Sequence, residues 1–136
     1  KYNLKERLDH GEVVYGEIVG PGIQKNYTYG LDEHTLVLFD LKMQDKDSSE
    51  FVSPELFQKW CETNRFNRTP ELYNGPYNKE LAYKLTFGPS VYAPVQKVRE
   101  GIVIKPIVET TCGMGRKLVK WISEDYLADD SNTDNH

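Results

Sequence analysis

The chain has 136 residues, with 17 lysines and arginines against 21 aspartates and glutamates, and a formal net charge of −4. This length fits one domain of ordinary size, and two separate domains are not expected. Because 38% of the residues are hydrophobic, the chain can bury a core, which excludes disorder throughout. No segment comes near the roughly 18 apolar residues that cross a bilayer, so a membrane protein is excluded as well.

The negative charge is concentrated at the end of the chain. Residues 124–136 hold five acidic residues and no lysine or arginine, which leaves 17 positive and 16 negative charges for the first 123 residues. A nearly neutral body excludes a histone-like polycation but is compatible with a nucleic-acid enzyme whose positive charge lines a groove. The polar end, residues 128–136, is expected to be a disordered acidic tail.

The cysteines and histidines indicate neither a disulfide scaffold nor a hydrolase. Cys61 and Cys112 lie 51 residues apart, and two cysteines lack the paired spacing of a zinc site. We expect reduced thiols in a cytoplasmic protein, or in the cytoplasm of an infected host cell if the protein is viral. His10, His34 and His136 lie in expected loops or in the tail, with no motif of a serine or cysteine nucleophile nearby.

A helix end and two strands are predicted first. Residues 1–10 mix apolar and charged side chains and stop at Gly11, as a helix end followed by a turn does. Residues 13–20 are rich in β-branched and aromatic residues and end at a Gly-Pro-Gly turn, which predicts a strand. Residues 35–42 form a nearly continuous apolar segment and predict a second, buried strand in the same sheet.

Two helices are predicted in the middle of the chain. Ser53 and Pro54 begin the first as a hydroxyl cap and a proline at the first helical position. Asn78 caps the second, which is expected to continue to about Phe87 and to end at a Gly-Pro pair. The expected inner face of the first helix consists of Leu56, Phe57, Trp60 and Cys61.

Two further strands and the order of the elements define the expected fold class. Residues 101–104 predict a buried strand, residues 117–122 predict another, and a turn at 112–115 lies between them. Strands and helices come in groups rather than in strict alternation. This order predicts an α+β domain with a mainly antiparallel sheet and flanking helices.

Three charged residues lie inside or directly beside the apolar strand segments, namely Glu17, Glu100 and Lys120. Burying an unpaired charge is costly, so such placements need a partner or a ligand, although each residue taken singly could point to solvent by strand alternation. Two carboxylates and an ammonium group on neighbouring strands could hold a divalent cation and a phosphate, because Mg²⁺ prefers oxygen ligands and lysine neutralises phosphate charge. The residues alone therefore indicate a site for phosphate and magnesium.

Four segments resemble, in order, the motifs of ATP-dependent RNA ligases. They are GEIVGPGIQ at 16–24, LFDL at 38–41, REGIVIKP at 99–106 and LVKWISEDYL at 118–127. These ligases belong to the covalent nucleotidyltransferase superfamily, with DNA ligases and mRNA capping enzymes. The resemblance covers residues 1–127, and the first and last segments look more like RNA ligases than like the other two groups.

The resemblance implies roles for four residues. Glu17 matches the glutamate near the nucleotide ribose, and Phe39 matches the aromatic residue that stacks on adenine. Glu100 matches the glutamate associated with the metal, and Lys120 the lysine on the phosphate, which makes these two the candidate catalytic residues. The roles suit the side chains, because carboxylates accept ribose hydrogen bonds, aromatic faces stack on bases and ammonium groups stabilise phosphoryl charge. For Phe39, packing in the core is a close competitor.

Two departures from the family pattern affect these expectations. The family attaches AMP to the lysine of a Lys-x-Asp-Gly motif, and this sequence contains no Asp-Gly dipeptide, so the chain offers no nucleophilic lysine. Ile122 occupies a position where some members carry a second lysine, which leaves the phosphate to Lys120. We therefore expect residues 1–127 to be the C-terminal part of an ATP-grasp-like nucleotidyltransferase domain, whose N-terminal part is a missing partner.

The resemblance implies a fragment of an ATP-dependent RNA ligase. Such an enzyme uses ATP and Mg²⁺ or Mn²⁺ to join RNA 3′-hydroxyl and 5′-phosphate ends through a lysyl-AMP intermediate. The fragment would supply nucleotide-, metal- and phosphate-binding motifs and would be inactive by itself. The alternatives are a non-catalytic nucleotide- or nucleic-acid-binding module and a fragment of a DNA ligase or capping-type enzyme.

Overall fold

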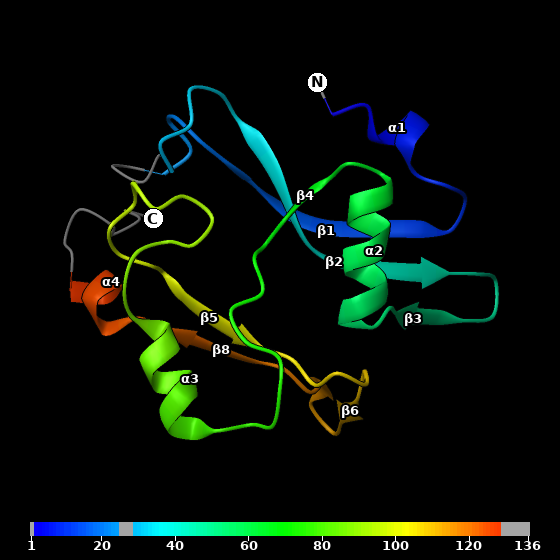
Figure 1. Ribbon diagram of the computed structural model, residues 1–136. Coiled ribbons are helices and arrows are strands. Elements are labelled where there is room, and N and C mark those ends of the chain that lie inside the picture. Colours follow the sequence, from blue (N-terminus) through cyan, green and yellow to red (C-terminus); the bar gives the residue numbers. More distant parts are fainter. Residues whose placement is uncertain (1, 25–28, 129–136) are drawn as a thin grey trace. The chain divides into compact units, whose positions relative to one another are not determined.

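The computed structural model describes residues 2–24 and 29–128 (Figure 1). The chain divides into two compact units, each assembled from separate stretches of sequence. Unit 1 comprises Lys1–Ile18, Leu36–Thr69 and Pro106–Lys117, and unit 2 comprises Val19–Thr35, Pro70–Lys105 and Leu118–His136. Of the predicted tail, Ala128 ends a helix and residues 129–136 lie outside the described residues.

The largest sheet is built around strand β2 (Thr35–Gln44), which pairs with β1 (Glu12–Val19), β3 (Ser49–Phe51) and β4 (Asn67–Arg68). The β3 pairing is antiparallel and the β4 pairing is parallel. Gly11 accepts a hydrogen bond from the amide of Gln44 at 2.7 Å, which joins the start of β1 to the end of β2. The two strands predicted at 13–20 and 35–42 are thus confirmed, and they share a sheet.

The core of unit 1 forms where helix α2 (Pro54–Thr63) packs on this sheet. Its buried residues are Leu38, Leu41, Phe57 and Cys61. Ser53 caps the helix as predicted, because its hydroxyl accepts a hydrogen bond from the amide of Leu56. The prediction that the Leu56 side chain faces inward is wrong, since it is 57% exposed. Phe57 and Cys61 are four residues apart and share the buried side of α2, and Leu56 and Trp60 form a neighbouring row on the helix surface. From that row the large Trp60 indole packs against the core.

The remaining elements of unit 1 are short. Helix α1 (Leu4–Arg7) is a single turn that ends before Gly11, in agreement with the prediction of a helix end there. Strands β6 (Thr111–Cys112) and β7 (Gly115–Arg116) form a small antiparallel hairpin around the turn predicted at 112–115. The sequence did not predict β3, β4, β6 or β7, because two or three residues carry no periodic pattern.

Unit 2 contains a two-stranded antiparallel sheet, β5 (Gly101–Ile104) with β8 (Val119–Ile122). Helix α3 (Lys79–Thr86), capped by Asn78 as predicted, packs against β5 (Figure 1). The prediction of a buried strand at 101–104 is wrong in part, since the Val103 side chain is 53% exposed. Val103 is exposed because β5 and β8 form a sheet of two strands, and α3 covers the opposite face. A short helix, α4 (Glu124–Ala128), follows β8 and was not predicted.

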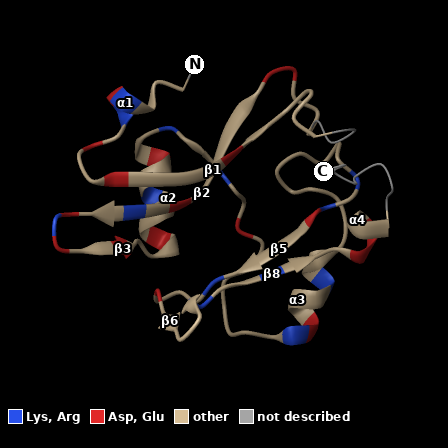
Figure 2. Cartoon of the chain, turned by 180° about the vertical axis from the view of Figure 1, so that it is seen from behind, with Lys and Arg blue, Asp and Glu red and all other residues tan. Residues whose placement is uncertain are grey.

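The observed elements confirm an α+β fold with a mainly antiparallel sheet, to which β4 adds a parallel pairing. Figure 2 shows basic and acidic residues interspersed along α2 and α3. Within residues 2–24 and 29–128, no helix combines the length and apolar character needed to span a membrane.

Candidate nucleotide and metal site

Two of the predicted site residues, Glu100 and Lys120, form an ion pair in unit 2. The Lys120 Nζ donates a hydrogen bond to the Glu100 Oε1 at 2.7 Å. The Glu100 side chain is 33% exposed and the Lys120 side chain is 53% exposed. Each of the two charges therefore has the other as its partner, as expected, and neither is fully buried.

The backbone of the β5–β8 pair sets this arrangement. The Glu100 carbonyl accepts a hydrogen bond from the Ser123 amide at 2.8 Å, which continues the ladder one step beyond Gly101. A Cβ at Gly101 would lie 2.2 Å from the carbonyl oxygen of Trp121, so the close approach of the two strands requires glycine at this position. Strand β5, which follows Glu100, and strand β8, which carries Lys120, are consequently held in one register.

Lys120 lies on the face of the strand pair opposite α3. Trp121 identifies the covered face, because its ring contacts Tyr83 of α3 with a centroid distance of 5.7 Å. Neighbouring residues in a strand point to opposite faces, which places Lys120 on the other side of the sheet from Trp121. Val103 lies directly opposite Lys120 in the ladder and shares that face. The open face therefore presents an ammonium group beside an exposed apolar side chain.

An exposed ion pair can exchange its partners for ligands. Such pairs contribute about 0.2–1 kcal/mol, so a phosphate and a metal ion can replace the contact between Lys120 and Glu100 at small cost. Among the described residues, no group of three or more His, Cys, Asp or Glu side chains could hold a metal. Mg²⁺ is commonly bound through one or two carboxylates together with the phosphates of a substrate. Glu100 fits a metal ion that arrives with a nucleotide.

The other two predicted site residues belong to unit 1. Glu17 lies in β1 and is exposed, which agrees with the solvent-facing alternative. Phe39 lies in β2 between the buried residues Leu38 and Asp40 and is itself half-buried. The structure thus brings Glu100 and Lys120 into contact within one unit and places Glu17 and Phe39 on two paired strands of the larger sheet.

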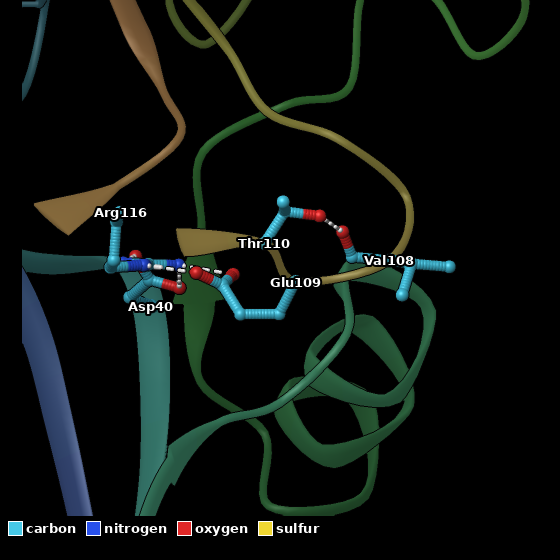
Figure 3. Close-up of polar contacts among 5 residues, drawn as sticks. All are labelled: Asp40, Val108, Glu109, Thr110 and Arg116. Carbon is cyan, nitrogen blue, oxygen red and sulfur yellow. Dashed lines mark hydrogen bonds and ion pairs between the residues drawn. The ribbon is translucent and has the colours of Figure 1, made fainter. Parts of the chain in front are cut away.

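A second cluster of charges, in unit 1, was not predicted (Figure 3). The Arg116 guanidinium donates to Glu109 at 2.6 Å and 2.8 Å, and to Asp40 at 2.6 Å and 3.4 Å. It also lies over the Phe51 ring, 3.5 Å from the centroid. The hydrogen bonds that Arg116 donates, first to Glu109 and then to Asp40, raise its pKa despite partial burial. The cluster fastens the β6–β7 hairpin to β2.

Only one member of this cluster carries a signal in the sequence. Asp40 interrupts an apolar strand segment, which is the same criterion that singled out Glu17. Arg116 follows a glycine-containing turn and gives no such signal. The two residues are 76 positions apart, so their contact is visible only once the chain has folded.

Comparisons with known proteins identify the family. The family model described as RNA ligase matches residues 1–122. The chain belongs to the RNA ligase family. A search among curated proteins found no match.

Solved RNA ligase structures share the fold. A Naegleria gruberi RNA ligase with PPi matches with a TM-score of 0.69 and 24% identity, over 90% of this chain and 35% of that chain. A lysine-to-alanine mutant of a Naegleria gruberi RNA ligase with ATP and Mn matches with a TM-score of 0.68, at the same identity and coverage. The chain therefore spans about a third of the length of the ligases it matches. The predicted family and fold are confirmed.

The four segments that resemble RNA ligase motifs coincide with observed elements. The first begins in β1 and the second lies within β2. The third contains Glu100 and β5, and the fourth contains β8 and all of α4 except its last residue. These four segments are therefore carried mainly by strands and their ends, where backbone pairing limits side-chain positions.

Proposed function

We propose that this chain supplies the nucleotide-, metal- and phosphate-binding residues of an ATP-dependent RNA ligase, which joins RNA 3′-hydroxyl and 5′-phosphate ends through a lysyl-AMP intermediate. The observation that carries this proposal is the contact of Glu100 with Lys120 in a member of the RNA ligase family. A Naegleria gruberi ligase with the same fold is described with ATP and Mn, which supports both cofactors.

Each of the four residues has a task in this proposal. Lys120 donates hydrogen bonds to a phosphate oxygen and stabilises the charge that shifts as the phosphoryl group is transferred. Glu100 holds Mg²⁺ or Mn²⁺, which when bound neutralises phosphate charge. The Glu17 carboxylate accepts hydrogen bonds from the ribose hydroxyls, and the Phe39 ring stacks on adenine. Residues 1–127 form part of the nucleotidyltransferase domain, and the nucleophilic lysine comes from outside this chain.

The first test is the intact mass of the natural gene product after incubation with ATP and Mg²⁺. A mass increase of one adenylate is the expected result, because the ligase reaction begins with self-adenylation. The absence of Asp-Gly in this chain favours one alternative, a nucleotide-binding module without catalysis. That alternative is supported if ATP binds and no adduct forms. Comparison of sealing on nicked RNA and nicked DNA then separates RNA ligases from DNA ligases.

A second test is substitution of the ion pair in the same gene product. Lys120→Ala and Glu100→Ala should each abolish RNA sealing, because both groups act on charge that develops in the transition state. Lys59→Ala is the control, since Lys59 forms an ion pair of similar length with Glu55 on α2. Near-normal sealing by either site variant would contradict the assignment.

A further inference from the structure

Arg99, the residue before Glu100, links the end of helix α3 to the start of β5. Its Nη1 donates a hydrogen bond to the carbonyl of Leu85, and its Nη2 donates to the carbonyl of Pro89 at 3.0 Å. Its backbone amide donates to the carbonyl of Gly88 at 2.7 Å. One residue therefore makes hydrogen bonds to three carbonyls of a single short segment, residues 85–89.

This segment needs donors from elsewhere in the chain. The last four carbonyls of a helix have no partner within it, and α3 ends at Thr86. Gly88 has a φ of 100°, a left-handed conformation that turns the chain away from the helix before Pro89. A guanidinium group suits this position, because its donors form a rigid fork that can reach two carbonyls at once.

Glu100 is held on its other side by strand β8. Its carbonyl accepts the Ser123 amide at 2.8 Å, and the adjoining Gly101 lies against the backbone of Trp121. The backbone of Glu100 thus lies between two anchors, the end of α3 and β8. From this position its carboxylate receives the hydrogen bond from Lys120.

We propose that Arg99 is a positioning residue that sets the place of the Glu100 carboxylate for metal binding. This inference rests on the proposed function, in which Glu100 holds the metal that accompanies ATP. Arg99 donates to backbone carbonyls of the α3 segment, so it acts on Glu100 through the main chain. Groups that orient a metal-binding side chain commonly change metal affinity by 10- to 100-fold when they are lost.

The test measures ATP binding to the natural gene product by titration calorimetry at increasing Mn²⁺ concentrations. The value compared between variants is the Mn²⁺ concentration that gives half of the maximal increase in ATP affinity. Arg99→Lys keeps the charge, but its single ammonium group cannot reproduce the rigid fork. It should raise this concentration by about tenfold and leave ATP binding in EDTA unchanged. Excess Mn²⁺ should restore binding. A thermal unfolding curve recorded for each variant confirms that the protein is folded at the assay temperature.

Arg68→Lys is the matched control, because Arg68 is a half-buried arginine in unit 1 that donates to a backbone carbonyl, that of Thr69. It should leave the metal dependence unchanged. Glu100→Ala reports on the proposed function separately, since it should remove the metal enhancement altogether. If Glu100→Ala removes the enhancement and Arg99→Lys matches the unmodified protein, the inference about Arg99 is overturned and the proposed function stands.

Two further outcomes also decide the question. Normal metal enhancement in Glu100→Ala would overturn the metal role of Glu100 and, with it, the inference. Unfolding of Arg99→Lys at the assay temperature would assign Arg99 to the stability of unit 2 as a whole and would likewise overturn its role as a positioning residue.

Discussion

Replacing Glu100 with glutamine should change ATP binding in opposite directions with and without metal. In the proposed site, a phosphate must compete with the Glu100 carboxylate for Lys120, whose Nζ lies 2.7 Å from the Glu100 Oε1. Glutamine keeps the size of the side chain and removes its charge. Metal-free ATP should therefore bind the variant more tightly, whereas metal-dependent ATP binding should weaken, because the proposed carboxylate ligand is lost.

The expected gain for metal-free ATP follows from the exposure of the pair. With side chains 33% and 53% exposed, the interaction belongs with surface ion pairs, which contribute about 0.2–1 kcal/mol. Releasing Lys120 from it should improve affinity about 1.4-fold to 5-fold. Because salt screens surface charges, the gain should shrink at high ionic strength.

Titration calorimetry of the natural gene product with ATP, in EDTA and then in Mn²⁺, measures both effects. Glu55→Gln serves as the control, since Glu55 pairs with Lys59 at 2.8 Å on the exposed side of α2 and has no role in the proposed site. The reasoning is refuted if Glu100→Gln and Glu55→Gln have the same effect in both conditions, or if metal-free ATP binds Glu100→Gln more weakly than the unmodified protein.

Three further predictions concern stability. Gly101→Ala should destabilise the chain by about 1–3 kcal/mol in urea unfolding, because the new Cβ meets a carbonyl of β8, whereas Gly113→Ala, where no atom lies within 4 Å, should change little. Burial raises the pKa of the Cys61 thiol to about 11, so the stability that the buried neutral thiol contributes should be complete below pH 9 and be lost as the pH rises towards 11. A thiol reagent at neutral pH should modify exposed Cys112 far faster than buried Cys61. Arg116→Met should cost about 3 kcal/mol in urea unfolding at neutral pH, since it removes the cation that both carboxylates contact; an unchanged free energy of unfolding would contradict this explanation.

The sequence predicted those elements whose signals are local. Ser53 and Asn78 are side-chain caps that act within three residues, and both helices begin where they indicate. The apolar segment at 35–42 is long enough to identify β2. Glu100 and Lys120 stand out in the sequence because a charge at an apolar strand is unusual, and the structure shows them in contact, while their roles stay a prediction. The prediction did not require knowledge of distant contacts.

What the sequence did not reveal depends on contacts between distant residues. Strand β4 has two residues and exists because it pairs with β2 in parallel, with Asn67 opposite Val37. The ion pairs of Arg116 form between segments with no local relationship. Leu56 is apolar, as core residues are, but its side chain is exposed. The rotation of α2 on the sheet decides which apolar residues of the helix face the core. Side-chain type alone does not fix these outcomes.

The division into two discontinuous units limits how this chain can be taken apart. The polypeptide passes between the units five times, and the stretch that connects β5 to β8 belongs to unit 1 while both of those strands belong to unit 2. A break in the backbone at any point between residues 19 and 117 would distribute the residues of both units over two fragments. Neither unit can be inherited, exchanged or expressed as one uninterrupted segment of a gene. A continuous segment that contains all of one unit must also carry two of the three stretches of the other.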